Sequence, residues 1–200
     1  MTVELITGLA VFTLVAAITP GPNNLMLMAS GVNFGIRRTL PHLWGVVLGF
    51  TFMILLISLG IGQLFQRFPA SYEVLRVVSV IYMLWLAWKI ATASEPGSGG
   101  EGSAKPLTFM QAAAFQWVNP KGWTMGITAV TLYSLGSDWR AAILMAVIFG
   151  AVTLPCSGVW AVLGQQMRGF LHTPRRLLLF NVGMAVLLIL SLYPVLWPSV

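Results

Sequence analysis

The sequence predicts an all-α integral membrane protein in which six transmembrane helices form two inverted three-helix repeats. Its 200 residues are 58% hydrophobic and only 8% charged, whereas a soluble domain carries about a quarter charged residues. The apolar residues gather in long runs, and a run of about 20 residues crosses the roughly 30 Å hydrocarbon core of a bilayer. Proline also interrupts the first run of each half. We therefore expect a membrane fold with helices 1 and 4 broken.

The first half holds three expected spans, which form a repeat over about residues 1–92. They run from about Leu5 to Val32, from about Leu40 to Phe65 and from about Val74 to Thr92. Residues 93–106 follow, and they are rich in glycine, serine and charged side chains. Such a stretch buries nothing, so we expect it to act as a flexible link.

The second half repeats this pattern over about residues 107–200. Its spans run from about Leu107 to Leu135, from about Ala141 to Leu163 and from about Leu177 to Trp197. The two pieces on either side of residues 119–122 are each too short to span alone, so we join them into one. The whole chain, residues 1–200, is then a single transmembrane domain.

Lys and Arg are shared unevenly between the two sets of loops. The loops after the first, third and fifth spans contain Arg37, Arg38, Lys89, Lys105, Arg168, Arg175 and Arg176. The opposite side contains only Arg67, Arg76 and Arg140. Because positive charge in short loops favours the cytoplasmic side, we expect both termini to be periplasmic in a bacterial inner membrane.

Prolines interrupt matching spans of the two halves. Pro20 and Pro22 break the first span, and Pro120 breaks the fourth. With three spans each, the halves run in opposite directions through the membrane, and paired breaks of this kind point to the binding site in inverted-repeat transporters. Proline lacks an N–H and clashes with the carbonyl one turn back, so nearby backbone groups need partners from protein, water or ligand. We therefore expect the breaks to line a cavity.

The breaks offer partners for both charges of an amino-acid zwitterion. The resuming helix presents free N–H groups and a positive dipole end to a carboxylate, and the interrupted helix presents carbonyls to an ammonium. Asparagines beside the breaks add donors and acceptors and are suited to cap the resuming helices. The candidate substrate-binding residues are Thr19, Pro20, Gly21, Pro22, Asn23, Asn24, Asn119, Pro120 and Lys121. The alternative for the first break is a proline kink with an asparagine cap and no ligand.

Lys121 is the ionisable residue that we expect deepest in the membrane. A charged lysine at the bilayer centre costs about 2.5 to 3.5 kcal/mol on insertion scales, so we expect it to pair with a substrate carboxylate or to carry a coupling proton. A lysine that snorkels to the interface, or a misplaced span boundary, is the alternative. His42 is a second candidate proton carrier, although its place near a loop also suits an interfacial side chain. Gln111 and Gln116 either line the cavity or bond between helices.

Several kinds of chemistry are missing from the sequence. No Asp or Glu falls within an expected span, which favours a neutral cargo over a cationic one. There is no phosphate-binding Gly-x-x-x-x-Gly-Lys-Ser/Thr loop, and one cysteine with two histidines cannot build a recognisable metal site. The few basic residues are scattered, which argues against nucleic acid as a partner. We expect no enzyme activity, no metal and no cofactor.

Two motifs resemble those of a known family. Residues 19–23 (Thr-Pro-Gly-Pro-Asn) and 119–121 (Asn-Pro-Lys) resemble the lysine exporter superfamily, in its homoserine and threonine resistance branch, over essentially the whole chain. Residues 86–92 and 115–119 are similar to the cysteine and O-acetylserine exporter group. Exporters of basic amino acids in this superfamily tend to carry an acidic residue in the second helix, where Gly49 stands here.

The resemblance implies a secondary exporter of amino acids in the bacterial inner membrane that uses the proton gradient. We accordingly expect alternating-access export of a neutral amino acid or derivative, of the cysteine/O-acetylserine or homoserine/threonine type. The partners would be this small molecule, the lipid bilayer and protons, with a homodimer as one oligomeric form. The alternative is a membrane scaffold in which the prolines only shape helix packing. A membrane-embedded enzyme is disfavoured by the missing catalytic groups.

Overall fold

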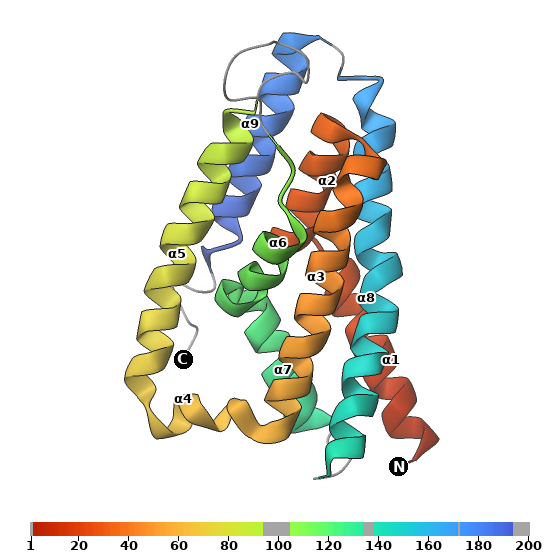
Figure 1. Cartoon of the computed structure of the whole chain (residues 1–200), viewed down its shortest axis with the longest axis vertical. Coiled ribbons are helices and arrows are strands. Elements are labelled where there is room, and N and C mark those ends of the chain that lie inside the picture. Colours follow the sequence, from red (N-terminus) through yellow and green to blue (C-terminus); the bar gives the residue numbers. More distant parts are fainter. Residues whose placement is uncertain (1, 94–104, 134–137, 172, 194–200) are drawn as a thin grey trace.

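The computed structural model describes residues 2–93, 105–133, 138–171 and 173–193, and every regular element among them is a helix (Figure 1). In the first half these are α1 (Val3–Ile18), α2 (Pro22–Phe34), α3 (Ile36–Leu56), the π-helical turn η1 (Ile57–Ile61), α4 (Gln63–Arg67) and α5 (Pro69–Ala91). In the second half they are α6 (Phe109–Phe115), the 3-10 turn η2 (Gln116–Val118), α7 (Pro120–Leu132), α8 (Trp139–Arg168) and α9 (Pro174–Leu190). The expected all-α class is confirmed for these residues.

The core of the bundle combines elements from both halves of the chain. The long helix α8 packs against α1, α2 and α3, and α3 also packs on α6 (Figure 1). α5 and α9 lie side by side on the other flank. A reciprocal amide pair joins α2 to α9: Asn33 Nδ2 donates to Asn181 Oδ1 at 2.9 Å, and Asn181 Nδ2 donates to Asn33 Oδ1 at 3.3 Å. Buried polar groups thus find partners across the two halves.

Three helical segments of the described chain are long and apolar enough to cross a membrane, namely Ile36–Ile61, Ala70–Ala91 and Trp139–Arg168. α1 and α2 also qualify when they are taken together as one bent span. By length and composition the described residues therefore contain three or four spans. α9, with 17 residues, and the broken pair α6 and α7 fall outside this criterion, so the six-span arrangement stays a prediction.

The helix breaks lie at the positions predicted from Pro20, Pro22 and Pro120. α1 ends before Thr19 and α2 begins at Pro22, while η2 ends before Asn119 and α7 begins at Pro120. Both pre-proline residues are extended, with φ −65° and ψ 147° at Thr19 and φ −86° and ψ 104° at Asn119, because a following proline disfavours the helical region. Each resuming helix has proline in its first turn, where a missing N–H breaks no helical bond. α1 and α2 meet at 51°.

The observed second span differs from the predicted one at both ends. α3 already begins at Ile36 rather than near Leu40, and its continuation passes through the π-helical turn η1 before the short helix α4. Gly60 within η1 has φ 105°, a backbone conformation that residues other than glycine rarely adopt. The chain bends there, so the continuous helix predicted to Phe65 ends earlier.

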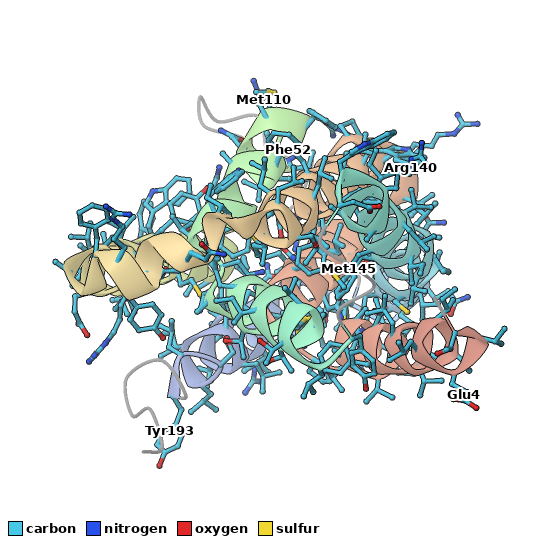
Figure 2. All side chains as sticks on the ribbon, turned by 90° about the horizontal axis from the view of Figure 1, so that it is seen from below. Glu4, Phe52, Met110, Arg140, Met145 and Tyr193 are labelled. Carbon is cyan, nitrogen blue, oxygen red and sulfur yellow. The ribbon has the colours of Figure 1, made fainter. Side chains whose placement is uncertain are left out.

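Apolar side chains cover the outside of the bundle as well as its inside. Val74 and Ile81 of α5 are each 63% exposed, although both are large hydrophobic residues. In the end-on view of Figure 2, Met110 points away from the bundle, whereas Met145 lies among the helices. An apolar surface of this extent is unfavourable in water but suits contact with lipid tails.

Two glycines let α3 approach α6 closely. A Cβ added at Gly45 would collide with the backbone carbonyl of Phe109, and one added at Gly49 would lie 2.6 Å from Ala113 Cα. Small residues of this kind allow helix backbones to pack tightly in membranes. Gly45 and Gly49 therefore serve the close packing of α3 on α6.

We predict that Gly49→Val lowers the thermal unfolding temperature of the detergent-purified protein. The new side chain must push α6 away, and overpacking of this kind costs about 1–3 kcal/mol. Gly158→Ala is the matched control, because a Cβ there meets nothing within 4 Å. Equal unfolding temperatures for the two variants would show that the contact between α3 and α6 is not tight.

Candidate functional site

The two helix breaks meet at one pocket, which we call the central pocket. It is bordered by α1, α2, α3, α7 and α8. Its lining residues are Ala16, Ala17, Gly21, Pro22, Asn23 and Asn24 around the first break, Asn119, Lys121, Gly122 and Met125 around the second, and Phe50, Thr153 and Ser157 from α3 and α8. Pro20 and Pro120 line a neighbouring pocket that shares Gly21, Pro22 and Lys121 with it. The break residues singled out from sequence are thus neighbours in space.

The carbonyls at the end of α1 have lost their helical partners and bond to side chains instead. Thr19 Oγ1 donates to Ala16 O at 2.8 Å, Asn24 Nδ2 to Ala17 O at 2.7 Å and Trp160 Nε1 to Ile18 O at 3.1 Å. Asn24 Nδ2 also donates to Thr19 O at 2.9 Å. A helix end within a membrane protein needs such donors because lipid offers none.

Lys121 of α7 completes this arrangement from the other half of the chain. Its Nζ donates to Thr19 O at 3.1 Å, to Thr19 Oγ1 at 2.9 Å and to Pro20 O at 3.3 Å. The ammonium therefore lies at the negative dipole end of α1. A Cβ at Gly21 would lie 2.8 Å from Lys121 Cδ, so the glycine makes room for the lysine stem. The break itself thus compensates the charge of Lys121.

A second pair of side chains connects the breaks. Asn23 Nδ2 donates to Gln116 Oε1 at 2.8 Å, and Gln116 Nε2 donates back to Asn23 Oδ1 at 3.1 Å and to Ala112 O at 2.9 Å. Of the two interpretations open for Gln116, the bond between helices is the one observed. Gln111 instead forms a capping box with Thr108 at the start of α6.

Two buried oxygens of the central pocket lack a hydrogen-bond partner among the described residues. They are Asn119 Oδ1 and Thr153 Oγ1, and their residues are only 3% and 4% exposed. Unpaired buried acceptors are rare in folded proteins and often mark the place of a ligand or water. Both atoms can accept a hydrogen bond from an ammonium group.

Sequence reasoning missed the contribution of α8. Thr153 and Ser157 lie four residues apart and therefore share one face of a helix. Ser157 Oγ donates to Asn24 Oδ1 at 3.3 Å, and Thr153 and Ser157 both line the central pocket. This pair of hydroxyls on one face of an otherwise apolar span was the available signal.

The expected capping by asparagine is wrong. The residue before α2 is Gly21, and neither it nor Asn119 before α7 makes a side-chain capping bond. Asn24 serves the carbonyls at the end of α1 instead. The reason is physical: Pro22 and Pro120 remove one N–H from each helix start, whereas the carbonyls of the broken α1 all need donors.

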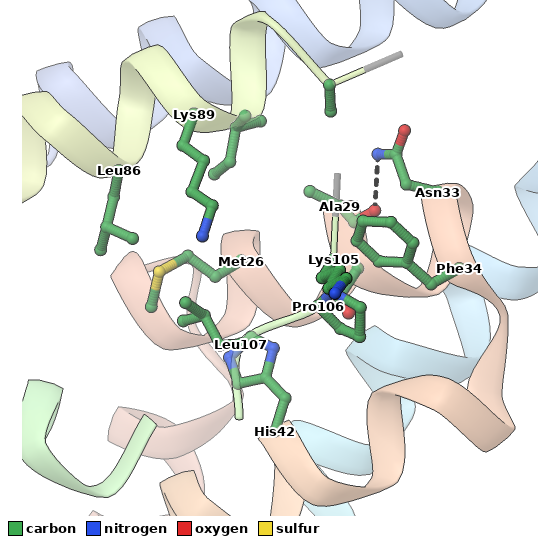
Figure 3. A pocket seen from close by; sticks show the side chains of 13 residues that line it. Met26, Ala29, Asn33, Phe34, His42, Leu86, Lys89, Lys105, Pro106 and Leu107 are labelled. Carbon is green, nitrogen blue, oxygen red and sulfur yellow. Dashed lines mark hydrogen bonds between the residues drawn. The ribbon is translucent and has the colours of Figure 1, made fainter. Parts of the chain in front are cut away.

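His42 lies away from the central pocket. It belongs to α3 and lines a different pocket, where it faces Met26 and Leu107 (Figure 3). It is 1% exposed, so its side chain lies inside the bundle, while its depth in the membrane stays a prediction. Of the two candidate proton carriers, only Lys121 reaches the breaks.

Comparison with known proteins gives the family. Residues 14–191 match the family model of the LysE type translocators. The chain belongs to this family. The cysteine/O-acetylserine efflux protein of Salmonella typhimurium (strain LT2) is 35% identical over 199 residues, which cover 94% of this chain and 96% of that protein. The protein of the same name from Escherichia coli (strain K12) is 34% identical over 198 residues, with the same coverage.

No solved structure matches this translocator. The family membership confirms the resemblance drawn from the two proline motifs, and with the apolar helices it identifies a membrane transporter rather than an enzyme.

We predict that Asn24→Leu destabilises the translocator by about 1–3 kcal/mol, since it leaves the part-buried carbonyl of Ala17 without its donor, whereas Thr19 O keeps Lys121 Nζ. Leucine keeps a similar side-chain volume. Chemical unfolding in detergent provides the measurement. Thr131→Val is the control, because Thr131 Oγ1 donates to Ile127 O at an exposed position. An Asn24→Leu variant as stable as this control would contradict the assigned role.

Proposed function

We propose that this translocator exports a neutral amino acid or amino-acid derivative across the bacterial inner membrane by alternating access. The cargo would be of the cysteine/O-acetylserine or homoserine/threonine type. One observation carries the proposal: two helix breaks from opposite halves enclose one pocket that contains an ammonium donor and two unpaired acceptors. A donor and acceptors that line one pocket suit a zwitterion.

The cargo carboxylate would bind Lys121 Nζ. This ammonium rests on Thr19 and Pro20, which are neutral acceptors, and a carboxylate is a stronger partner for it. The cargo ammonium would bind Asn119 Oδ1 and Thr153 Oγ1, the two unpaired oxygens. Lys121 would then release the end of α1 as the cargo arrives, which links cargo binding to the geometry of the break.

A neutral cargo is supported by the lining of the central pocket. No Asp or Glu stands among its described lining residues, so a cationic side chain would have no counter-charge. Gly49, where basic amino-acid exporters tend to be acidic, packs directly on Ala113 and leaves no room for a carboxylate. The names of the two relatives agree with a small neutral cargo.

Transport by alternating access requires contacts between the halves that can open. The amide pair between Asn23 and Gln116 is one such contact, because it joins α2 to η2 directly beside the central pocket. We include coupling to protons in the proposal. Lys121 is the better-placed carrier, since it touches both the pocket and the break.

The proposal also includes six spans in two inverted repeats. The bent pair α1 and α2, the segment from α3 to α4, and α5 would form the first repeat, and the broken pair α6 and α7, α8 and α9 the second. The distribution of Lys and Arg supports periplasmic termini.

Reporter fusions test this orientation. We predict that a fusion at Gly100 reports the cytoplasm and that a fusion after Val200 reports the periplasm, because three spans separate them. Alkaline phosphatase and green fluorescent protein fusions, which are active on opposite sides, provide the readout. Two fusions on the same side would rule out the inverted repeat.

Efflux from loaded cells tests the function itself. Cells preloaded with labelled neutral amino acids, cysteine first, should lose at least one of them faster with the translocator than without it. We predict that Lys121→Met abolishes this efflux, because the cargo carboxylate loses its cation. Lys121→Arg should also impair it, because a guanidinium keeps its charge and cannot release a proton.

The control is Arg140→Gln, which removes an exposed positive charge in the first turn of α8. Membrane amounts of each variant are measured together with efflux, since Lys121 also supports the end of α1. No accelerated efflux across the whole panel would favour the scaffold alternative. Wild-type efflux by a correctly inserted Lys121→Met protein would remove Lys121 from the site.

A further inference from the structure

A second pocket lies between α2, α3, α5 and the chain segment before α6 (Figure 3). Its wall is mostly apolar, with Met26, Leu86, Ile90 and Leu107 among its residues. A few polar groups on an apolar wall are typical of small-molecule sites. We call it the lysine pocket, after the two lysines that line it.

Two cations from different segments reach the lysine pocket. Lys89 comes from α5 and Lys105 from the segment before α6. Lys89 Nζ lies 5.1 Å from the ring centroid of Trp85, which steadies its position without neutralising its charge. Among the described residues no Asp or Glu lines this pocket, while Glu95 and Glu101 lie outside the described residues. Two ammonium groups at one pocket suit the binding of a small anion.

His42 supplies the observation that points to a ligand. Neither Nδ1 nor Nε2 has a hydrogen-bond partner among the described residues, although the side chain is almost fully buried. Its ring is directed into the pocket, toward Met26 and Leu107 (Figure 3). A neutral imidazole has one donor and one acceptor nitrogen, so it can serve a group with both kinds of partner. Leaving both nitrogens unpaired in an apolar wall is costly.

One face of α2 connects the lysine pocket with the central pocket. Asn23 lines the central pocket, and Met26, Ser30 and Asn33 line the lysine pocket. These residues are spaced by three or four positions, so they follow one side of the helix. The amide pair between Asn23 and Gln116 lies at the central-pocket end of this face. A cargo that moves along α2 would pass from one pocket to the other.

We propose that the lysine pocket is a cargo-recognition subsite on the cytoplasmic side, at which Lys89 and Lys105 bind the carboxylate of the amino acid before it reaches the central pocket. His42 accepts a hydrogen bond from the cargo ammonium there. This assignment rests on the proposed export function and on the proposed orientation, and it adds an entry site that the paired breaks do not reveal. The two sites recognise the same zwitterion in succession.

Transport kinetics test the proposal. In proteoliposomes loaded with graded concentrations of labelled cysteine, Lys89→Gln/Lys105→Gln should raise the half-saturating internal concentration by about tenfold, the size of effect expected when a charge-assisted hydrogen bond is lost. The maximal rate should change little, because Lys121 and the central pocket are intact. Each single variant should show a smaller rise than the double variant.

Internal cysteinamide separates carboxylate recognition from other effects. This compound keeps the ammonium and lacks the negative charge, so the double variant should change its inhibition of cysteine efflux much less than it changes the affinity for cysteine. Arg38→Gln is the matched control, because it removes an exposed positive charge at the same end of the molecule without lining the lysine pocket. Its half-saturating concentration should equal that of the wild type.

The transport experiments distinguish three outcomes. If the wild type exports no amino acid of the panel, the proposed function fails. If the wild type exports cysteine and the double variant has the same half-saturating concentration, only the entry subsite is wrong. The third outcome is that wild-type transport responds to internal phosphate, or to phosphatidylglycerol in place of phosphatidylcholine, and that the double variant loses this response without a change in cysteine affinity. That outcome would assign the pocket to a phosphate or lipid headgroup and overturn the proposal.

Discussion

The contact between the Lys121 ammonium and the open end of α1 is the interaction on which the rest of the site depends. A helix that stops inside a membrane protein exposes carbonyls that lipid cannot satisfy, and a lysine placed there needs acceptors. Lys121 Nζ donates to oxygens of Thr19 and Pro20 at distances of 2.9–3.3 Å. The carbonyls thus gain a donor and the ammonium gains acceptors. Because α1 and α7 come from different halves, the same contact holds the two breaks together.

The two breaks differ in how fully they are satisfied. The carbonyls around Thr19 have donors from Asn24, Trp160 and Lys121, whereas Asn119 Oδ1 beside the second break has none among the described residues. A cargo ammonium fits the free acceptor, and its carboxylate can take Lys121 from α1. Cargo binding would then loosen one half while it engages the other, which is the differential interaction that a conformational change requires.

Proline chemistry favours breaks at Pro22 and Pro120, which suit the first turn of a helix, although Pro41 and Pro155 lie inside α3 and α8. The family could likewise be inferred from the two motifs. The hydrogen-bond partners could not, since Asn24, Ser157 and Trp160 reach their partners only through the packing of α8 against α1 and α2. The burial of His42 could not be predicted either, because it depends on the elements that α3 meets in the fold.

A crystal structure of the translocator with a bound cargo amino acid tests the central claim most directly. We predict that the cargo carboxylate lies within hydrogen-bond distance of Lys121 Nζ, that its ammonium contacts Asn119 Oδ1 or Thr153 Oγ1, and that the bonds from Lys121 to Thr19 and Pro20 are lengthened or broken. A cargo bound elsewhere, with Lys121 still on those two residues, would contradict it.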